Sequence, residues 1–280
     1  MLKSLLGLMS PAGPRARLSV LIFHRVLPAP DPLFPDEVDA SRFDEMCGWI
    51  KRWFNVLALD EAVFRLKAGT LPSRAACITF DDGYADNSQV ALPILTHHGL
   101  VATFFVATGF LDGGRMWNDT VIESIRLTKS ASIALNQVFG DDGPTLPLAT
   151  IFDRRSAFDL LIARLKYLSI AERLALTERI AEVTEVDVPI NLMMTTAEVV
   201  GMRRSGMQIG AHTVSHPILA TLDRTSAKTE IAESKLKLET ILGERVSLFA
   251  YPNGKPGADY NSDSVEVVRE LGFDAAVSTH

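Results

Sequence analysis

Short apolar runs rich in β-branched and aromatic residues alternate along this chain with segments of helical periodicity. This alternation is typical of parallel sheets whose strands are joined by helices. Seven runs predict strands, at residues 19–23, 55–57, 75–80, 102–106, 208–211, 247–250 and 274–277. The repeated order of helix, glycine and strand favours closure of these strands into a barrel.

Other residues mark the expected ends of the helices. Ser41 predicts the N-cap of a helix that runs through Trp49. Five glycines stand where a helix would end in a left-handed residue, at positions 69, 99, 206, 243 and 272. His97 and His98 directly precede one of them, and at a helix C-terminus they are expected to be structural.

The alternation stops between about Leu111 and Asn191, where no run predicts a strand. Residues 153–183 are instead dominated by helix formers with aliphatic residues at helical spacing. Residues 140–144 predict a loop from their turn residues. We therefore expect an N-terminal segment, 1–17, and one domain, 18–280, with a helical insertion between the fourth and fifth strands.

Composition narrows the class of protein. The 280 residues allow one large domain or two small ones, and 47% hydrophobic with 22% charged residues is typical of a globular protein. A net charge of −6 argues against non-specific nucleic-acid binding, which needs a basic face. Cys47 and Cys77 lie in apolar contexts without metal-type spacing, so we expect buried free thiols.

The N-terminus carries a short apolar stretch that is interrupted by Pro11 and Pro14 and followed by Arg15 and Arg17. It lacks the longer apolar core and small-residue cleavage site of an export signal. No apolar run approaches the roughly 20 residues of a membrane span. We therefore expect a cytoplasmic protein, with peripheral membrane contact as an open alternative.

Two adjacent carboxylates, Asp81 and Asp82, follow the third predicted strand, and Gly83 permits a sharp turn after them. Because side chains alternate along a strand, one carboxylate can bind a metal while the other transfers a proton. The alternative is a solvated turn or a helix cap, which Asp and Gly also favour.

A second segment places His212 and His216 after the fifth strand, at a spacing that faces both imidazoles the same way on a helical turn. Ordinary loop histidines are the alternative. One Asp with two His is, however, a recurrent ligand set for Zn²⁺ or another first-row divalent ion. A third segment, residues 247–254, runs into a Pro-Asn-Gly turn whose backbone N–H groups could face an oxyanion. By itself this third segment fits a plain turn equally well.

With these segments the chain resembles the polysaccharide deacetylase family, whose domain is also called the NodB-homology domain or carbohydrate esterase family 4. The resemblance implies an α/β fold, a distorted (β/α)7 barrel, with the helical insertion outside it. It also implies Asp81 as catalytic base, Asp82, His212 and His216 as metal ligands, and the Asn253 N–H as oxyanion donor.

The sequence departs from the family pattern in two places. Ala250 stands where many members carry the Arg that orients the base, and the usual Leu-x-His segment of the catalytic acid is absent. A permuted branch, which includes the poly-N-acetylglucosamine deacetylases, places that histidine near the N-terminus. Residues 21–26 are similar to its motif, so His24 is the expected acid. His280 is a competitor for that role, and a buried structural His24 is the other alternative.

The activity implied is metal-dependent removal of N-acetyl groups from an amino-sugar glycan or glycan intermediate, in surface-glycan assembly. Zn²⁺ is the expected metal, with Co²⁺ or Ni²⁺ as alternatives. Tyr251, Pro252 and Trp117 are candidate substrate contacts. Cyclic amide or ureide hydrolysis and a non-catalytic carbohydrate-binding relic remain competing interpretations. Because the chain stops where a strand would lead into an active-site loop, we also expect the natural protein to continue past His280.

Overall fold

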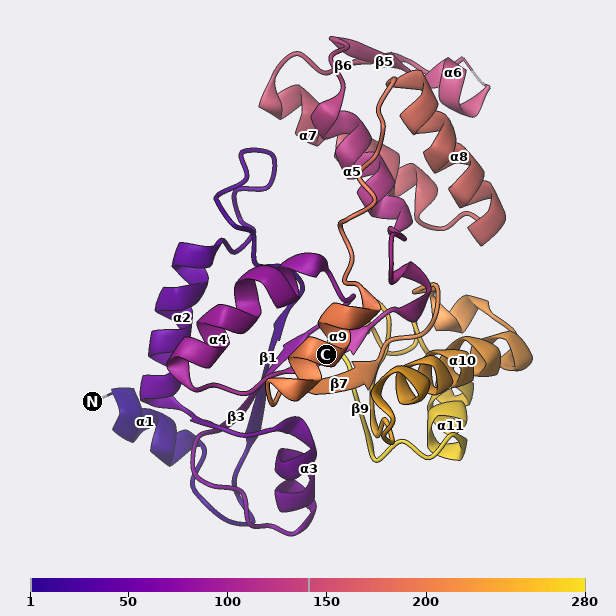
Figure 1. Ribbon diagram of the computed structural model, residues 1–280. Helices are drawn as coiled ribbons and strands as arrows, with labels where there is room; N and C mark the ends of the chain where they lie inside the picture. The colour runs from indigo at the N-terminus through magenta and orange to yellow at the C-terminus, as the bar shows by residue number, and fades with distance from the viewer. Residues whose placement is uncertain (1, 141, 280) are drawn as a thin grey trace. The chain divides into compact units, whose positions relative to one another are not determined.

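The computed structural model describes residues 2–140 and 142–279 (Figure 1). Within them, seven strands form one sheet in which every pairing is parallel. These strands are β1 (Leu18–Phe23), β2 (Asn55–Val56), β3 (Ala75–Phe80), β4 (Thr103–Val106), β7 (Gln208–Ala211), β8 (Leu248–Ala250) and β9 (Ala275–Val277). All seven predicted strands are confirmed, each within one residue at either end.

The sheet curls but stays open. Its order is β1-β3-β4-β7-β8-β9, with β2 paired to the first residues of β3, and β1 and β9 do not pair with each other among the described residues. The α/β class and the (β/α)7 plan are thus confirmed, in the form of a half-barrel. Because every strand is parallel, all carboxyl ends share one edge of the sheet.

Both faces of β3, in the interior of the sheet, are covered, so all six of its residues are inaccessible. Alternate side chains point to opposite faces. Cys77 and Phe105 pack in a cluster with Leu59 of α3 (Leu59–Lys67). Phe80 and Phe104 stack on each other in a second, larger cluster, which lies on the opposite face of the sheet.

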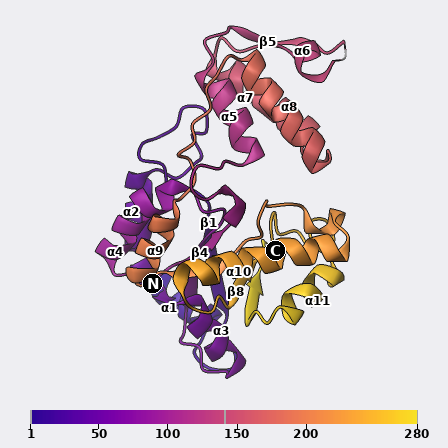
Figure 2. The ribbon, with the colours of Figure 1, turned by 45° about the vertical axis from the view of Figure 1, so that its right-hand side comes forward.

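Helices connect consecutive strands of this sheet, as the alternating pattern predicts. They are α2 (Ala40–Trp53), α3, the π-helix η1 (Asn87–Ala91), α4 (Leu92–His98), η2 (Thr108–Phe110), α9 (Thr196–Arg204), η3 (Leu219–Thr221), α10 (Arg224–Leu242) and α11 (Ser262–Glu270), with α1 (Leu2–Met9) before β1. The last two long helices, α10 and α11, lie side by side (Figure 2). None of the described helices has the length and apolar character needed to cross a bilayer.

The helix ends follow the glycines. Gly99 and Gly243 cap α4 and α10 in the left-handed conformation, and Gly69, Gly206 and Gly272 also have positive φ, as expected. The N-cap prediction at Ser41 is wrong. Asp39 caps α2 instead, because its carboxylate accepts hydrogen bonds from the first free N–H groups of the helix.

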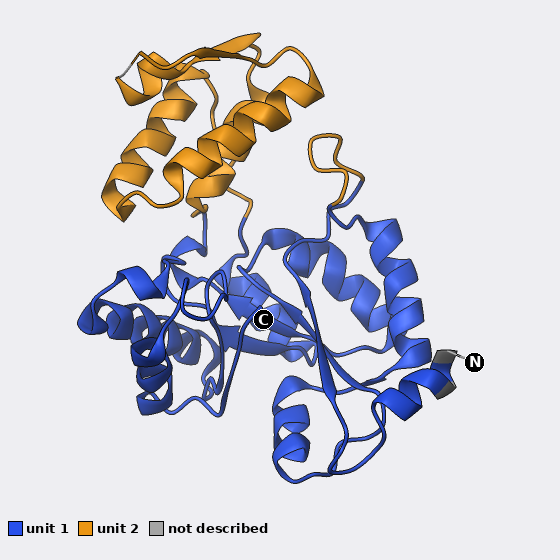
Figure 3. Cartoon of the chain, turned by 180° about the vertical axis from the view of Figure 1, so that it is seen from behind, with its two compact units in different colours: residues 1–29, 37–113, 193–280 blue, residues 30–36, 114–192 orange. Residues whose placement is uncertain are grey.

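The chain divides into two compact units (Figure 3). Unit 1 holds the sheet, and unit 2 comprises residues 30–36 and 114–192. Unit 2 contains α5 (Trp117–Leu127), α6 (Leu135–Phe139), α7 (Ile151–Leu165) and α8 (Ile170–Val183) around its own apolar cluster. In the predicted loop at 140–144, Gly140 caps α6 and residue 141 lies outside the described residues.

The expectation of a strand-free insertion is wrong in one detail. Two antiparallel strands, β5 (Ser132–Ala134) and β6 (Thr145–Pro147), pair within unit 2. Their sequences, Ser-Ile-Ala and Thr-Leu-Pro, contain no apolar run that would predict a strand.

Candidate active site

The turn after β3 brings both aspartates to the carboxyl edge of the sheet. Asp81 N–H donates to the carbonyl oxygen of Phe23 on β1 (3.0 Å), and Gly83 N–H donates back to the carbonyl of Asp81 (3.0 Å). Asp82 and Gly83 have φ of 76° and 90°, and a Cβ at Gly83 would lie 3.1 Å from Val106 Cγ1. A glycine is therefore required for the chain to turn this sharply.

The turn after β7 carries the two histidines. His212 is buried at the end of the strand, and His216 is partly buried. The helical turn expected from their spacing is wrong, because Thr213 and His216 both adopt positive φ, 65° and 53°. The His216 N–H donates to Thr213 Oγ1 (3.1 Å), and this bond closes the turn.

Glu230 of α10 holds the same loop from outside. Its carboxylate accepts the Val214 N–H (2.9 Å), the Ser215 N–H (2.8 Å) and the Ser215 hydroxyl (2.7 Å). Three bonds to one carboxylate fix the loop between the histidines. Sequence reasoning did not identify Glu230, since nothing in a helix sequence shows which loop a side chain will contact.

Asp82, His212 and His216 converge on one point. Asp82 Oδ1 lies 3.4 Å from His212 Nε2 and 3.3 Å from His216 Nε2, and the three potential ligand atoms lie within 4.8 Å of one another. Asp82 Oδ1 is buried and makes no hydrogen bond with the described residues. A carboxylate oxygen and two imidazole nitrogens in this arrangement fit a divalent metal of the zinc type.

A contact on the opposite side of the His212 ring fixes its tautomer. His212 Nδ1 lies 2.8 Å from the carbonyl oxygen of Ala250 on β8. Since a carbonyl only accepts, Nδ1 carries a proton, so when the imidazole is neutral its lone pair lies on Nε2, the nitrogen nearer Asp82. Metal-ligating histidines are commonly oriented in this way.

The pKa of Asp82 depends on the two histidines, and the pKa of His212 depends on the carboxylates beside it. Burial alone would raise the pKa of Asp82, but the imidazoles of His216 and His212 hold it well below its ordinary value. Burial alone would lower the pKa of His212, but the Asp82 and Asp81 carboxylates raise it. The site therefore favours a carboxylate surrounded by positive charge.

Asp81 has a different environment from its neighbour. It is buried, its Oδ1 makes no hydrogen bond with the described residues, and burial raises its pKa despite the nearby imidazole of His212. A carboxylate whose pKa is raised is a stronger base, which suits proton abstraction near neutral pH.

His24 follows β1 and lies next to these carboxylates. The register pairs Phe23 with Phe80, and the charge of His24 lowers the pKa of both Asp81 and Asp82. The alternative of a buried structural histidine is wrong, because His24 is exposed. Its competitor His280 lies outside the described residues.

Two residues that sequence reasoning missed clamp the segment carrying His24. Asn87 Nδ2 donates to the carbonyl of His24 (2.9 Å). The buried Asp86 accepts the Val26 N–H at Oδ1 (3.2 Å) and Arg25 Nε at Oδ2 (2.8 Å). Their position in the helical segment that directly follows the turn of the paired aspartates was the available signal.

The third segment forms the expected turn after β8. Asn253 is exposed with φ of 62°, and its N–H makes no hydrogen bond with the described residues. Gly254 has φ of 79°, and a Cβ there would lie 2.7 Å from Thr279 N. The turn thus leaves one backbone donor available.

The three candidate substrate contacts, Tyr251, Pro252 and Trp117, pack against other residues of the protein. Pro252 is buried in the same turn. The Tyr251 ring is buried and stacks on Tyr260 with centroids 3.9 Å apart, and burial raises its pKa to about 12. Trp117 begins α5 in unit 2, where the Arg173 guanidinium lies 4.9 Å from the centre of its ring.

Backbone strain concentrates in these turns. Of the seven non-glycine residues with positive φ in the described part of the chain, four are Asp82, Thr213, His216 and Asn253. Such conformations cost about 1–3 kcal/mol each and cluster where function requires them.

Comparisons with known proteins agree with this geometry. The profile of the family described as polysaccharide deacetylase matches residues 68–126 and 163–276, which is more than half of the chain. YxkH of Bacillus subtilis (strain 168), whose name refers to a polysaccharide deacetylase, is 21% identical over 266 residues. That alignment covers 94% of this chain but only 65% of YxkH.

Solved structures share the fold. The deacetylase PplD of Streptococcus pyogenes, in complex with acetate, superposes with a TM-score of 0.60 at 19% identity over 94% of this chain and 84% of PplD. IcaB from Ammonifex degensii superposes with a TM-score of 0.60 at 18% identity, over 96% of this chain and 84% of the IcaB chain. A de-N-acetylase from Aggregatibacter actinomycetemcomitans superposes with a TM-score of 0.57 at 17% identity, over 93% of this chain and 87% of the de-N-acetylase chain. The chain belongs to the polysaccharide deacetylase family.

Proposed function

We propose that this protein removes N-acetyl groups from an amino-sugar glycan or glycan intermediate, in a reaction that depends on a divalent metal. The observation that carries the proposal is the convergence of Asp82, His212 and His216 beside a second buried carboxylate, Asp81. Membership of the family supports a deacetylase, and the names of the similar structures refer to deacetylases.

We assign the metal to Asp82, His212 and His216, with Zn²⁺ as first choice. Two observations support this assignment. Asp82 Oδ1 is buried and makes no hydrogen bond with the described residues, and Nε2 of the neutral His212 imidazole has a lone pair for a metal. A bound divalent ion supplies Lewis-acid chemistry, polarising the acyl carbonyl and acidifying water.

The protein groups then account for the proton transfers. Water adds to the acetyl carbonyl carbon, and Asp81 takes the proton that this water loses. We assign the hydrogen bond to the oxyanion that forms to the Asn253 N–H, and its lack of a partner among the described residues on a turn of positive φ supports this role. As the C–N bond breaks, His24 gives a proton to the leaving nitrogen, so the products are acetate and a free amine.

His24 is supported as the acid by its exposure beside Asp81 and by the clamp from Asn87 and Asp86. We propose that Pro252 lines the substrate site and that Tyr251 supports the turn by packing beneath it. For Trp117 we propose only a role in unit 2, whose α-helical core it adjoins. We further propose that unit 2 is an insertion into the deacetylase domain.

The direct test is acetate release from N-acetylglucosamine oligomers by protein loaded separately with Zn²⁺, Co²⁺ or Ni²⁺. We expect release by the loaded protein, and a loss of about 10²–10⁴-fold in Asp81→Asn, which removes the base but keeps the shape. Release from small cyclic amides but not from the oligomers would contradict the proposed substrate class.

A further inference from the structure

An exposed apolar surface lies at the end of unit 1 where α1, β1 and α2 meet. The outward side of α1 is formed by Leu5, Leu8 and Met9, at positions i, i+3 and i+4 of one helical face. The exposed side of a helix in water is normally polar. Here Leu8 is 80% exposed.

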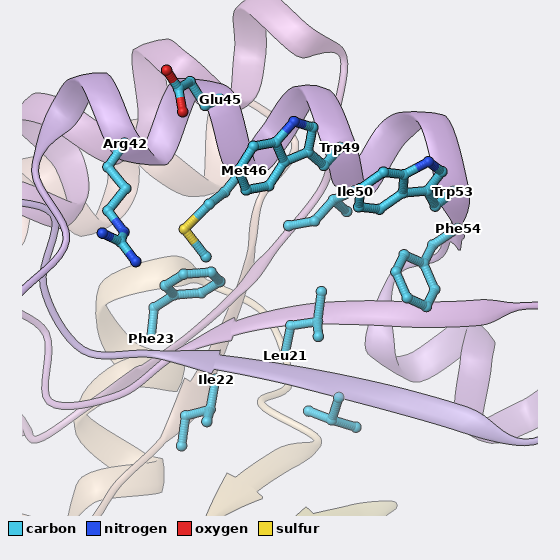
Figure 4. Close-up of a pocket in the computed structure, with 11 residues that line it drawn as sticks. Leu21, Ile22, Phe23, Arg42, Glu45, Met46, Trp49, Ile50, Trp53 and Phe54 are labelled. Carbon is cyan, nitrogen blue, oxygen red and sulfur yellow. The ribbon is translucent and has the colours of Figure 1, made fainter. Parts of the chain in front are cut away.

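The same surface continues onto α2 and the free edge of the sheet. Trp49 is exposed and stacks on Trp53 one turn later, with ring centroids 6.1 Å apart. Val20 and Ile22, which share one face of the edge strand β1, are also exposed. An apolar pocket of about 680 Å³ lies between α2 and β1, and Phe23, the residue before His24, is among the residues that line it (Figure 4).

Hydrogen bonds show that these parts are contiguous. Arg74 N–H donates to the carbonyl of Ser10 at the end of α1 (2.9 Å), and Arg74 Nη1 donates to the carbonyl of Trp53 (2.7 Å). Ser10 also exchanges two hydrogen bonds with Arg17, which precedes β1. We call this surface, formed by α1, β1 and the last turns of α2, the α1–α2 face.

The charge of the α1–α2 face differs from that of the whole protein. The chain carries −6 overall, yet its first thirty residues contain Lys and Arg and no Asp or Glu. Lys3, Arg15 and Arg17 are exposed there, and Lys51 and Arg52 are exposed at the end of α2. None of these five pairs with a carboxylate within the described part of the chain.

Exposed aliphatic side chains, tryptophans and a basic border together match the interface of an anionic lipid bilayer. A second copy of the chain fits less well, because a two-fold interface would bring the same basic residues of both copies together. Glu45 lines the pocket, but Figure 4 shows its carboxylate pointing away from β1. We propose that the α1–α2 face binds peripherally to an anionic membrane surface.

The test is co-sedimentation of the full chain with vesicles of phosphatidylcholine alone and of phosphatidylcholine mixed equally with phosphatidylglycerol. We expect binding to the mixed vesicles only, weakened by added salt. Leu8→Ser should lower the binding constant about tenfold, because fewer methylenes enter the bilayer. The double variant Arg15→Gln, Arg17→Gln should lower it by a similar factor.

The matched control is Phe152→Ser, which removes a side chain that is 77% exposed on α7 of unit 2. It should bind like the wild type, and far-ultraviolet circular dichroism of each variant checks folding. No binding of the wild type, or an equal loss in Phe152→Ser, would overturn the proposal. So would a lipid-free dimer that Leu8→Ser converts to a monomer, since a second copy would then cover this face.

Discussion

His212 Nδ1 lies 2.8 Å from the carbonyl oxygen of Ala250, the residue that stands where many family members carry an arginine. Strand β8 thus contributes a backbone acceptor to the proposed metal ligand His212 at the position where it lacks a side-chain cation. Burial raises the pKa of Asp81, and the nearby imidazole of His212 opposes this rise. The proposed metal ligand His212 is therefore also the histidine that influences the pKa of the proposed base, Asp81.

This link predicts how metal affinity depends on pH. In the metal-free protein the pKa of His212 is raised above its ordinary value, so its imidazole stays protonated to higher pH than a free one. A metal must displace that proton, so affinity should rise with pH up to this pKa and then level off. Calorimetric titration with Zn²⁺ in buffers of different ionisation enthalpy measures the released protons. Binding that is independent of pH between 5 and 8 would contradict the assignment.

The role of His24 can be separated from that of the metal ligands by changing the leaving group. His24→Gln should keep its metal and lose about 10²–10⁴-fold in acetate release from N-acetyl substrates, whose amine must be protonated. His24→Gln should lose far less activity on 4-nitrophenyl acetate, since the 4-nitrophenolate leaving group departs without a proton. If His280→Gln shows this pattern and His24→Gln does not, the acid has been misassigned.

The clamp on the His24 segment predicts a stability effect. Asp86→Ala removes the acceptor of the buried Val26 N–H and of Arg25 Nε, so unfolding should become easier by about 1–3 kcal/mol. Urea denaturation followed by circular dichroism measures this change. Asp159→Ala, at an exposed position of α7, is the matched control and should change stability by less than about 0.5 kcal/mol. Equal effects would show that Asp86 contributes no specific contact.

The two cysteines should resist modification in the folded state. Burial raises the pKa of both Cys47 and Cys77 to about 12, so almost no thiolate is present at neutral pH. Reaction with Ellman's reagent should therefore be slow in native protein and immediate for two thiols in denaturant. Fast labelling of either native thiol would mean that this part of the core opens readily.

Much of the fold could be predicted because most strands coincide with short apolar runs, and the interior strands are buried on both faces. The stretch at β3 is an example, with every residue inaccessible. The pair β5–β6 was missed because neither Ser-Ile-Ala nor Thr-Leu-Pro is an apolar run. Asp39 rather than Ser41 caps α2, and only the backbone path decides between two such neighbouring candidates.

The candidate site was predictable as far as residue type and strand order reach. Asp82 and the two histidines follow strands that are two places apart in the sheet, and parallel pairing brings their ends to one edge. The sequence could not show the positive φ of Thr213, which replaces the expected helical turn. Nor could it show the contacts from Glu230 and Asp86, which depend on tertiary packing.

The central claim is that Asp82, His212 and His216 hold a metal while Asp81 performs the proton transfer. The most direct measurement determines bound metal and acetate release in the same samples of wild type, His212→Ala and Asp81→Asn. We predict that His212→Ala loses both metal and turnover, whereas Asp81→Asn keeps full metal and loses turnover. Full metal occupancy in His212→Ala, or wild-type acetate release from Asp81→Asn, would contradict the account.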